Sequence, residues 1–405
     1  KDLPVDTGDE IGLLSENVND MTRALVEAAV NENMLLGGKE VQRAFLPLDE
    51  VSIEGKKVKQ SVGRLDTPYA QFFGYYEGAK GVSGDYFDYK KLDDRWYVLI
   101  KCDASGHGVP AALLMTVVAT LFRTYFANWS YEKNGTRIDT VVSQINDFIE
   151  SLGIKGKFAA IIICLFDTVS GDVYMCNAGD NIVHIYDNMA RKETELTLFE
   201  TPAAGPLPSS LVNMKGGFKV EKTHLQKGDV LFLYTDGIEE ATRKFRSPSF
   251  AVMHCAEQGL HPGDIHGNHK VGEDSEQLEN RRVGEIIESV FARRAYTLEK
   301  FHNPIPDEEL VFDFSTCKGT IEEAVIALVS IEKVFRMYKS PDVTAADIVR
   351  VDKKIDAFLE KHFNRYNYYC GVKRESVEGP NYFEYVYLRE DEQLDDLTLL
   401  AVRRP

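Results

Sequence analysis

Residues 96–110 read WYVLIKCDASGHGVP, an almost unbroken apolar run that ends at Asp103. A run of this length and composition, followed by Ser and Gly, predicts a buried β-strand that ends in a turn. Asp103 therefore adjoins side chains that require burial. Carboxylates are seldom buried unless they are paired or bound to a cation, so the stretch predicts a strand with a chemically demanding group at its end.

The same pattern occurs at three other places far apart in the chain. Asp85 lies in SGDYFD, Asp236 in YTDG and Asp395 in DDLTLL, each beside an apolar run. Any one of these aspartates alone is ordinary turn chemistry. Together they predict a site for hard divalent cations, because Mn²⁺ and Mg²⁺ prefer oxygen ligands. Two such ions can acidify a bridging water and clamp a phosphoryl group.

The order of these motifs resembles that of the SpoIIE/RsbU-type serine phosphatases, a bacterial branch of the metal-dependent PPM protein phosphatases. The resemblance covers roughly residues 41–243 and the last dozen residues. Asn177-Ala178-Gly179 and Gly205-Pro206-Leu207 match further motifs of that family. Asp180, Pro208 and Ser83 depart from it, because His, Gly and Gly are common at those positions.

The periodicity of the chain by itself predicts an α+β sandwich. The resemblance sharpens this to a PPM-type sandwich of two antiparallel β-sheets flanked by helices. Helices are expected at residues 110–127 and 138–152. Strands are expected at residues 72–77, 86–91, 96–103, 158–167, 172–177, 182–186, 229–235 and 397–403, with hairpin turns at residues 93–94 and 170–172.

The resemblance also implies a ligand set for two divalent cations, Mn²⁺ or Mg²⁺. Asp103 would be shared by both ions, Asp85 and the Ala104 carbonyl would hold one, and Asp236 and Asp395 the other. The neighbouring Asp88 and Asp396 would be outer or surface groups. The implied reaction is in-line attack by the metal-bridged water on a phosphoserine or phosphothreonine, and no side-chain nucleophile takes part.

His107 is a candidate general acid, since imidazole often donates protons near neutral pH. The alternative interpretation is that Gly106 to Pro110 turns the chain into a helix, with Pro110 near its first position. The acid candidate of animal PPM enzymes lies two residues after the shared aspartate, which is Ser105 here. Lys80 is the nearest cation before Asp85, or simply a solvated turn residue. Lys80, Ser105 and Gly106 are thus candidate substrate contacts.

Composition narrows the classes of partner. The 405 residues carry a net charge of −17, which argues against nucleic acid and anionic lipid as partners. The six cysteines include no Cys-x-x-Cys pair, as expected in a reducing compartment. No run of eighteen apolar residues and no signal peptide is found in the sequence.

Residues 1–30 resemble the second half of a HAMP domain. The signature DTGDEIG at residues 6–12 precedes an apolar seam at helical spacing, from Ile11 to Leu25. HAMP units normally follow a transmembrane helix and form parallel dimers. The expectation is a homodimer through this helix, a helical linker at residues 31–47 and a phosphatase domain at residues 48–405. The chain would be the cytoplasmic domain of an inner-membrane protein whose upstream transmembrane segment is missing. The alternative is an amphipathic helix packed on its own domain.

Residues 245–390 form a predicted insertion, mostly helical, because relatives have a much shorter interval before the last strand. Helical periodicity is seen at residues 282–295, 320–338 and 344–363. Its first part, up to residue 277, is rich in Gly, His and charge and predicts a loop. Four histidines there make zinc binding conceivable, although their spacing fits no closed site.

Two functions follow from these patterns. The favoured one is a phosphoserine/phosphothreonine protein phosphatase that acts as the output domain of a HAMP-linked membrane receptor. Its substrate, by analogy with the family, would be a phosphorylated STAS-type anti-sigma-factor antagonist. The alternative is a catalytically weak signalling module that relays the HAMP state to a partner through the insertion.

Overall fold

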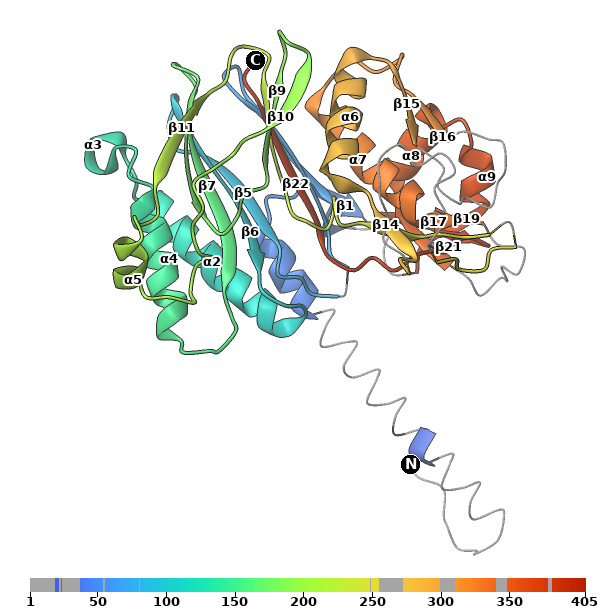
Figure 1. Ribbon diagram of the computed structural model, residues 1–405, viewed down its shortest axis with the longest axis horizontal. Coiled ribbons are helices and arrows are strands. Elements are labelled where there is room, and N and C mark those ends of the chain that lie inside the picture. The colour runs from blue at the N-terminus through green and yellow to red at the C-terminus, as the bar shows by residue number, and fades with distance from the viewer. Residues whose placement is uncertain are drawn as a thin grey trace, which may run out of the picture.

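The computed structural model describes residues 19–21, 23, 37–53, 55–79, 81–247, 249–254, 272–298, 310–339, 348–377 and 381–405. Two antiparallel sheets pack face to face, with helices outside each of them (Figure 1). The predicted α+β sandwich of two antiparallel sheets is therefore confirmed. The predicted HAMP segment lies outside the described residues, apart from residues 19–21 and 23.

The two sheets are built from strands that are distant in sequence. The first sheet has five strands in the order β11-β8-β7-β6-β5, and the second has six in the order β10-β9-β12-β22-β4-β3. The strands of the first are β5 (Tyr86–Lys91), β6 (Trp96–Ala104), β7 (Ala159–Asp167), β8 (Asp172–Ala178) and β11 (Val220–His224). Those of the second are β3 (Val62–Asp66), β4 (Gln71–Glu77), β9 (Val183–Asp187), β10 (Lys192–Glu195), β12 (Val230–Tyr234) and β22 (Leu397–Arg403).

Helices α2 (Val109–Ala127) and α4 (Asp139–Ser151) cover the outer face of the five-stranded sheet (Figure 1). Among the described helices, α2 alone has the length and apolar composition of a membrane span. It buries Val118 and Phe122 in the core beside β6, so its apolar character has a packing explanation. Short helices α3 (Tyr131–Asn134) and α5 (Ser209–Met214) follow α2 and precede β11.

The outer face of the six-stranded sheet is covered by α6 (Glu279–Ala292) and α7 (Ile321–Arg336). Helix α7 packs on β4 and β22, and every residue from Ala324 to Arg336 is buried. Thr320 and Glu323 form a capping box that fixes its first turn. Because these helices complete the sandwich, part of the stretch predicted as an insertion is a layer of the core fold.

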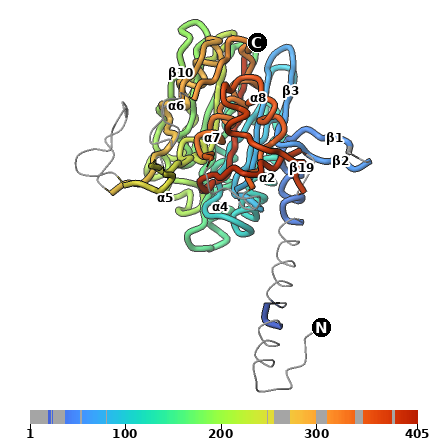
Figure 2. Tube along the Cα trace, turned by 90° about the vertical axis from the view of Figure 1, so that its right-hand side faces the viewer, coloured from blue at the N-terminus to red at the C-terminus, as the bar shows by residue number. Residues whose placement is uncertain are grey.

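The remainder of residues 245–390 adds short elements beside this layer. The helix predicted at residues 344–363 is wrong in its first part, because β-branched alternation makes residues 348–352 a strand. The elements of this region are β13 (Thr242–Lys244), β14 (Ser275–Gln277), β15 (Ala295–Leu298), β16 (Leu310–Asp313), β17 (Met337–Tyr338), β18 (Ile348–Asp352), α8 (Lys353–His362), α9 (Tyr366–Cys370), β19 (Val372–Glu375), β20 (Tyr382–Val386) and β21 (Arg389–Glu390). Figure 2 shows the hairpin of β1 (Glu50–Ile53) and β2 (Lys56–Lys59) projecting from the body.

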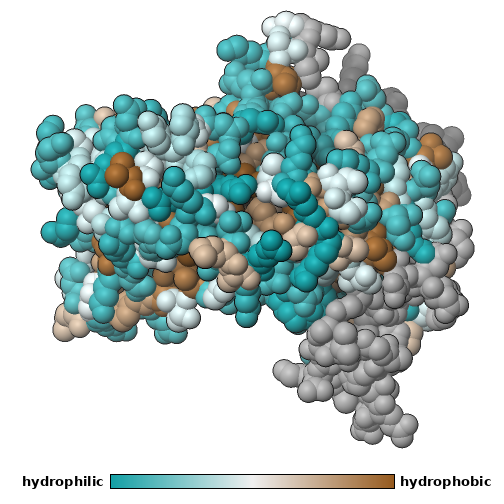
Figure 3. Space-filling view, turned by 90° about the horizontal axis from the view of Figure 1, so that it is seen from above, coloured by the Kyte–Doolittle hydropathy of each residue, from teal (hydrophilic) through white to brown (hydrophobic). Residues whose placement is uncertain are grey.

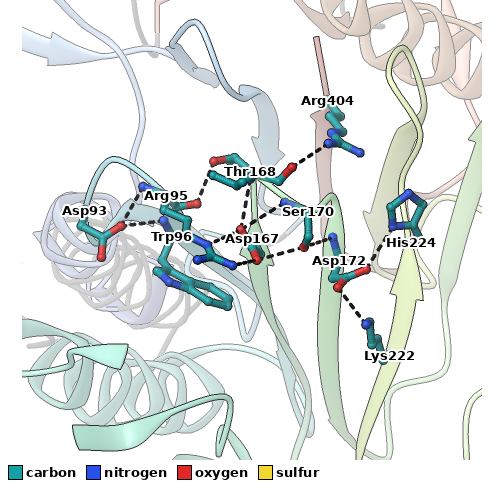
Figure 4. Close-up of polar contacts among 11 residues, drawn as sticks. Asp93, Arg95, Trp96, Asp167, Thr168, Ser170, Asp172, Lys222, His224 and Arg404 are labelled. Carbon is teal, nitrogen blue, oxygen red and sulfur yellow. Dashed lines mark hydrogen bonds and ion pairs between the residues drawn. The ribbon is translucent and has the colours of Figure 1, made fainter. Parts of the chain in front are cut away.

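One end of the five-stranded sheet is closed by hairpin turns, as the sequence predicted (Figure 4). Asp93 Oδ1 accepts hydrogen bonds from the backbone of Arg95 and Trp96, both at 2.7 Å. The Arg95 guanidinium binds Asp167 through both carboxylate oxygens, at 2.8 and 2.6 Å. Hydrogen bonds from Lys222 and His224 lower the pKa of Asp172 to about 2. The polar side chains at this end of the sheet therefore hydrogen-bond to one another and hold the turns in place.

The hydrophilic character of the surface agrees with the high net charge of the chain. The face seen in Figure 3 is dominated by hydrophilic side chains, and apolar side chains lie on it only in scattered patches. Cys102, Cys164 and Cys176 are fully buried in strands of the five-stranded sheet, as small core residues.

Candidate metal centre

The four predicted aspartates lie at one end of the sandwich. Asp103 is the second-last residue of β6, and the start of β5 next to it follows Asp85, since Tyr86 pairs with Cys102. Asp236 follows the end of β12 and Asp395 precedes the start of β22, and these strands pair with Tyr234 opposite Leu399. Strand pairing within each sheet and the packing of the sheets thus join motifs that are up to 310 residues apart.

The charges of these carboxylates act on one another. Burial, followed by the charges of Asp236 and Asp395, raises the pKa of Asp103 to about 7. Burial and then Asp395 raise the pKa of Asp236 to about 6. Burial, then Asp103 and Asp396, raises the pKa of Asp85 well above its ordinary value. Such clustering of like charges is unfavourable without a cation.

The donor groups present fit a hard cation. Asp236 Oδ1 is buried and lacks a hydrogen-bond partner among the described residues. The Thr235 hydroxyl donates to Asp85 Oδ2 at 2.7 Å. Within the described ranges, no three His, Cys, Asp or Glu side chains already have the spacing of a formed metal site. Side-chain movements would therefore be needed to close these carboxylates on an ion.

Two glycines allow the loops of the centre to approach. A Cβ on Gly84 would lie 2.4 Å from the carbonyl oxygen of Ala104, and one on Gly237 would lie 2.1 Å from the carbonyl oxygen of Asp396. Ala104 N also donates to Gly84 O at 3.2 Å. Only glycine fits at such distances, so these residues bring Ala104 and the Asp395 segment to the site.

Asp396 and Asp88 are buried, so of the two roles expected for them, outer group or surface group, the surface role is wrong. Asp396 accepts hydrogen bonds from the backbone of Ala79 at 2.7 Å and of Gly84 at 3.3 Å. It thereby fixes both ends of the loop before Asp85. Asp88 instead binds Arg123 at 2.8 Å and Tyr86 at 2.8 Å, away from this loop.

Ser105, Gly106 and His107, the candidate substrate contacts and the candidate acid, lie in the turn between β6 and α2. His107 is exposed in the turn before α2, which begins at Val109, so the turn that leads into a helix is confirmed. The Ser105 hydroxyl accepts from Phe158 N at 2.9 Å, and Gly106 has a positive φ of 86°. Lys80 lies outside the described residues. Lys157 Nζ donates to the Ser105 carbonyl at 3.0 Å, which places a cation beside this turn.

A buried lysine beside the centre was not predicted. Lys101 Nζ lies 2.7 Å from Asp180 Oδ1, and both side chains are almost fully buried. The same ammonium donates to the carbonyl of Tyr234 at 2.6 Å, two residues before Asp236. The position of this lysine inside the apolar run WYVLIKC was the feature of the sequence that could have indicated its burial. The lysine ties β6 to the end of β12, and Asp180 compensates its charge.

The linker helix at residues 37–45 contacts the same loop. Gln42 is buried, accepts from Ser83 N at 3.0 Å through Oε1 and donates to the Ser83 carbonyl through Nε2. This side-chain amide therefore mimics a strand partner for the residue two positions before Asp85. Nothing in the local sequence pattern marked Gln42.

Comparison with known proteins supplies independent findings. Residues 93–265 match the family of stage II sporulation protein E (SpoIIE), a range that includes Asp103 and Asp236. Protein IcfG of Synechocystis is 26% identical over 270 residues, which is 60% of this chain and 38% of that protein. Phosphoserine phosphatase RsbU of Bacillus subtilis is 24% identical over 162 residues, which is 40% of this chain and 44% of that protein. The chain thus matches less than half the length of these relatives.

Solved structures with a similar arrangement include the SiaA-PP2C domain of Pseudomonas aeruginosa, with 15% identity and a TM-score of 0.48 over 94% of this chain and 99% of that one. The phosphatase domain of SpoIIE from Bacillus subtilis has 10% identity and a TM-score of 0.41, over 88% of this chain and 69% of that one.

The two antiparallel sheets with helices outside form the α+β fold expected of a PPM-type phosphatase. Residues 93–265 match the SpoIIE family, and part of the chain is similar to RsbU, as the motifs predicted. The resemblance seen in its motifs is confirmed at this level.

Proposed function

We propose that this protein is a metal-dependent phosphoserine/phosphothreonine protein phosphatase. The observation that carries the proposal is the group formed by Asp85, Asp103, Asp236 and Asp395, in which one buried oxygen of Asp236 has no hydrogen-bond partner among the described residues. An all-oxygen, strongly acidic donor set is suited to Mn²⁺ or Mg²⁺. The match to a family of phosphatases supports the reaction class.

The chain's own residues would hold the cations as the motifs imply. Asp103 would be shared, Asp85 and the Ala104 carbonyl would serve one ion, and Asp236 and Asp395 the other. When bound, the cations would supply the positive charge that acidifies a water and neutralises phosphoryl oxygens. The Thr235 hydroxyl orients Asp85, Asp396 fixes the preceding loop, and Lys101 fixes the end of β12. Lys157 and Ser105 lie beside the segment that carries Asp103, where a phosphorylated chain would enter.

The physiological setting is part of the same proposal. A relative named phosphoserine phosphatase supports a phosphoprotein substrate, and we propose a STAS-type anti-sigma-factor antagonist. The HAMP-like residues 1–30 support a role as the cytoplasmic output domain of a dimeric membrane receptor. The contact between Gln42 and Ser83 offers a route from that segment to the loop before Asp85.

The test is hydrolysis of p-nitrophenyl phosphate and of a phosphoserine protein, measured over a titration with Mn²⁺ and Mg²⁺. Asp103→Asn should lose metal-dependent turnover of both substrates. Asp167→Asn is the matched control, because that aspartate also lies in the five-stranded sheet, on the strand next to β6, but binds Arg95 at the opposite end of the sheet. A wild-type protein without metal-stimulated hydrolysis would exclude the proposed activity and favour the signalling module.

A further inference from the structure

Lys333 is a buried lysine on α7, far from the candidate ligands in sequence. Its side chain is 2% exposed, and its ammonium lies 2.9 Å from Glu77 Oε1 and 3.3 Å from Gln393 Oε1. Helix α7 belongs to the stretch predicted as an insertion, in which no sequence pattern indicated a role in the site. Burying a cation costs free energy of desolvation, and the partners of the cation must offset that cost.

Both partners of Lys333 stand at strand ends that lead to the metal centre. Glu77 is the last residue of β4 and pairs with Leu397, the first residue of β22. Beyond Glu77 the chain enters the loop of Gly78 to Asp85. Before Leu397 it passes through Asp395 and Asp396. The Lys333 ammonium therefore contacts both segments that carry candidate ligands, close to where each segment joins the six-stranded sheet.

Gln393 is linked to a candidate ligand by a hydrogen bond, and Glu77 is linked through the chain to the loop before Asp85. Gln393 Nε2 donates to the carbonyl oxygen of Asp395 at 3.0 Å. Ala79 lies two residues after Glu77, and its backbone N–H donates to Asp396 Oδ1 at 2.7 Å. Tyr75 donates to the second carboxylate oxygen of Glu77 at 2.6 Å, so this carboxylate is held from two directions.

We propose that Lys333 is a positioning residue for the metal centre, which fixes Asp395 through Gln393 and the Asp85 loop through Glu77. This inference rests on the proposed function. It makes α7 a part of the machinery that shapes the ligand set, in addition to its role as a packing layer. Loss of the ammonium should let the Asp395 segment and the loop after Glu77 move independently.

The test compares Lys333→Met with Arg282→Met in the complete chain by calorimetric titration with Mn²⁺. Arg282 is an equally buried cation of the same helical layer, but it binds Glu276 and the carbonyls of Gln277 and Leu278. Lys333→Met should weaken Mn²⁺ binding about 10-fold or more, the usual effect of removing a partner of a metal ligand. Arg282→Met should bind Mn²⁺ as the wild type does, although it also loses thermal stability. Lys333→Arg should recover part of the affinity.

The outcomes separate the possibilities. Unchanged Mn²⁺ affinity in folded Lys333→Met overturns the proposal, and so does an equal loss of affinity in both methionine variants, since that would be a general effect of lost stability. Where Lys333→Met does not fold, Glu77→Gln/Lys333→Met removes both charges together and must still show the weaker binding. A wild-type chain that binds no Mn²⁺ would refute the proposed function itself, independently of Lys333.

Discussion

Asp103 is the residue on which the chemistry of the site depends most directly. It lies among Asp85, Asp236, Asp395 and Asp396, whose charges act on it together with burial to raise its pKa to about 7. Removing it eliminates the ligand implied to be shared by two cations, and it also removes repulsion from the metal-free protein. Activity and stability should therefore respond in opposite directions.

We expect Asp103→Ala to abolish Mn²⁺-dependent hydrolysis of p-nitrophenyl phosphate while its thermal midpoint in EDTA equals or exceeds that of the wild type. Differential scanning calorimetry and the phosphatase assay check the two parts. His107→Ala is the comparison, and it should reduce turnover far less because His107 is exposed in the turn before α2. A loss from His107→Ala as large as that from Asp103→Ala would restore His107 as the general acid.

At the scale of elements, buried ion pairs join the outer helical layer to its neighbours. Glu276 of β14 binds Arg243 of β13 at 2.6 Å and Arg282 of α6 at 2.9 Å, and all three side chains are almost fully buried. Glu276→Gln would remove the negative charge that both arginines bind. We expect the free energy of unfolding at pH 7 to fall by about 3–5 kcal/mol, measured by urea denaturation.

The pH dependence of this effect has a definite sign. Burial alone would raise the pKa of Glu276, but Arg243 and Arg282 outweigh it and hold the pKa below the ordinary value of 4.5. A lowered carboxyl pKa stabilises the fold above the unfolded pKa, and this stabilisation is lost as the pH falls through the folded one. The difference between wild type and Glu276→Gln should therefore shrink below about pH 4.5. A difference that is constant from pH 7 to pH 3 would contradict the ion-pair interpretation.

The linker helix supplies a second prediction at this scale. Gln42 makes two hydrogen bonds to Ser83, two residues before Asp85. Gln42→Ala should raise the Mn²⁺ concentration needed for half-maximal activity about 10-fold, the range typical of lost outer partners of a ligand. Arg43→Ala is the neighbouring control, because Arg43 binds the carbonyls of Lys59 and Gln60 on the β1–β2 side. Equal metal requirements in both variants would leave Gln42 a packing residue.

At the scale of the whole molecule, the N-terminal seam predicts assembly. Met21 is 59% exposed, which leaves it free to contact a second chain. If Val18 and Met21 belong to a parallel two-chain seam, Val18→Glu/Met21→Glu should place like charges face to face and dissociate the dimer. Sedimentation of wild type and variant, paired with phosphatase assays, measures both assembly and its effect on rate. A wild type that is monomeric at high concentration would reduce the segment to a tether.

The sequence determined the elements whose pattern is local. Alternating and continuous apolar runs predicted β5 and β22 at their observed bounds, and helical spacing predicted α2 and α4 to within one residue at each end. The four aspartates were recognisable because a carboxylate beside a buried strand is costly and needs a reason. Periodicity failed at residues 348–352, where β-branched residues in a sheet override helical spacing.

Only the tertiary structure decided which distant residues act together. Gln42 and Lys333 carry no local signal of a role in the site, and the apolar run around Lys101 does not reveal Asp180 as its partner, since these partners lie in other elements. The same holds for α6 and α7, which form the outer layer of the sandwich although the sequence set them apart as an insertion. Local pattern reports which side chains must be buried, whereas burial against a particular partner depends on strand pairing and layer packing across the whole chain.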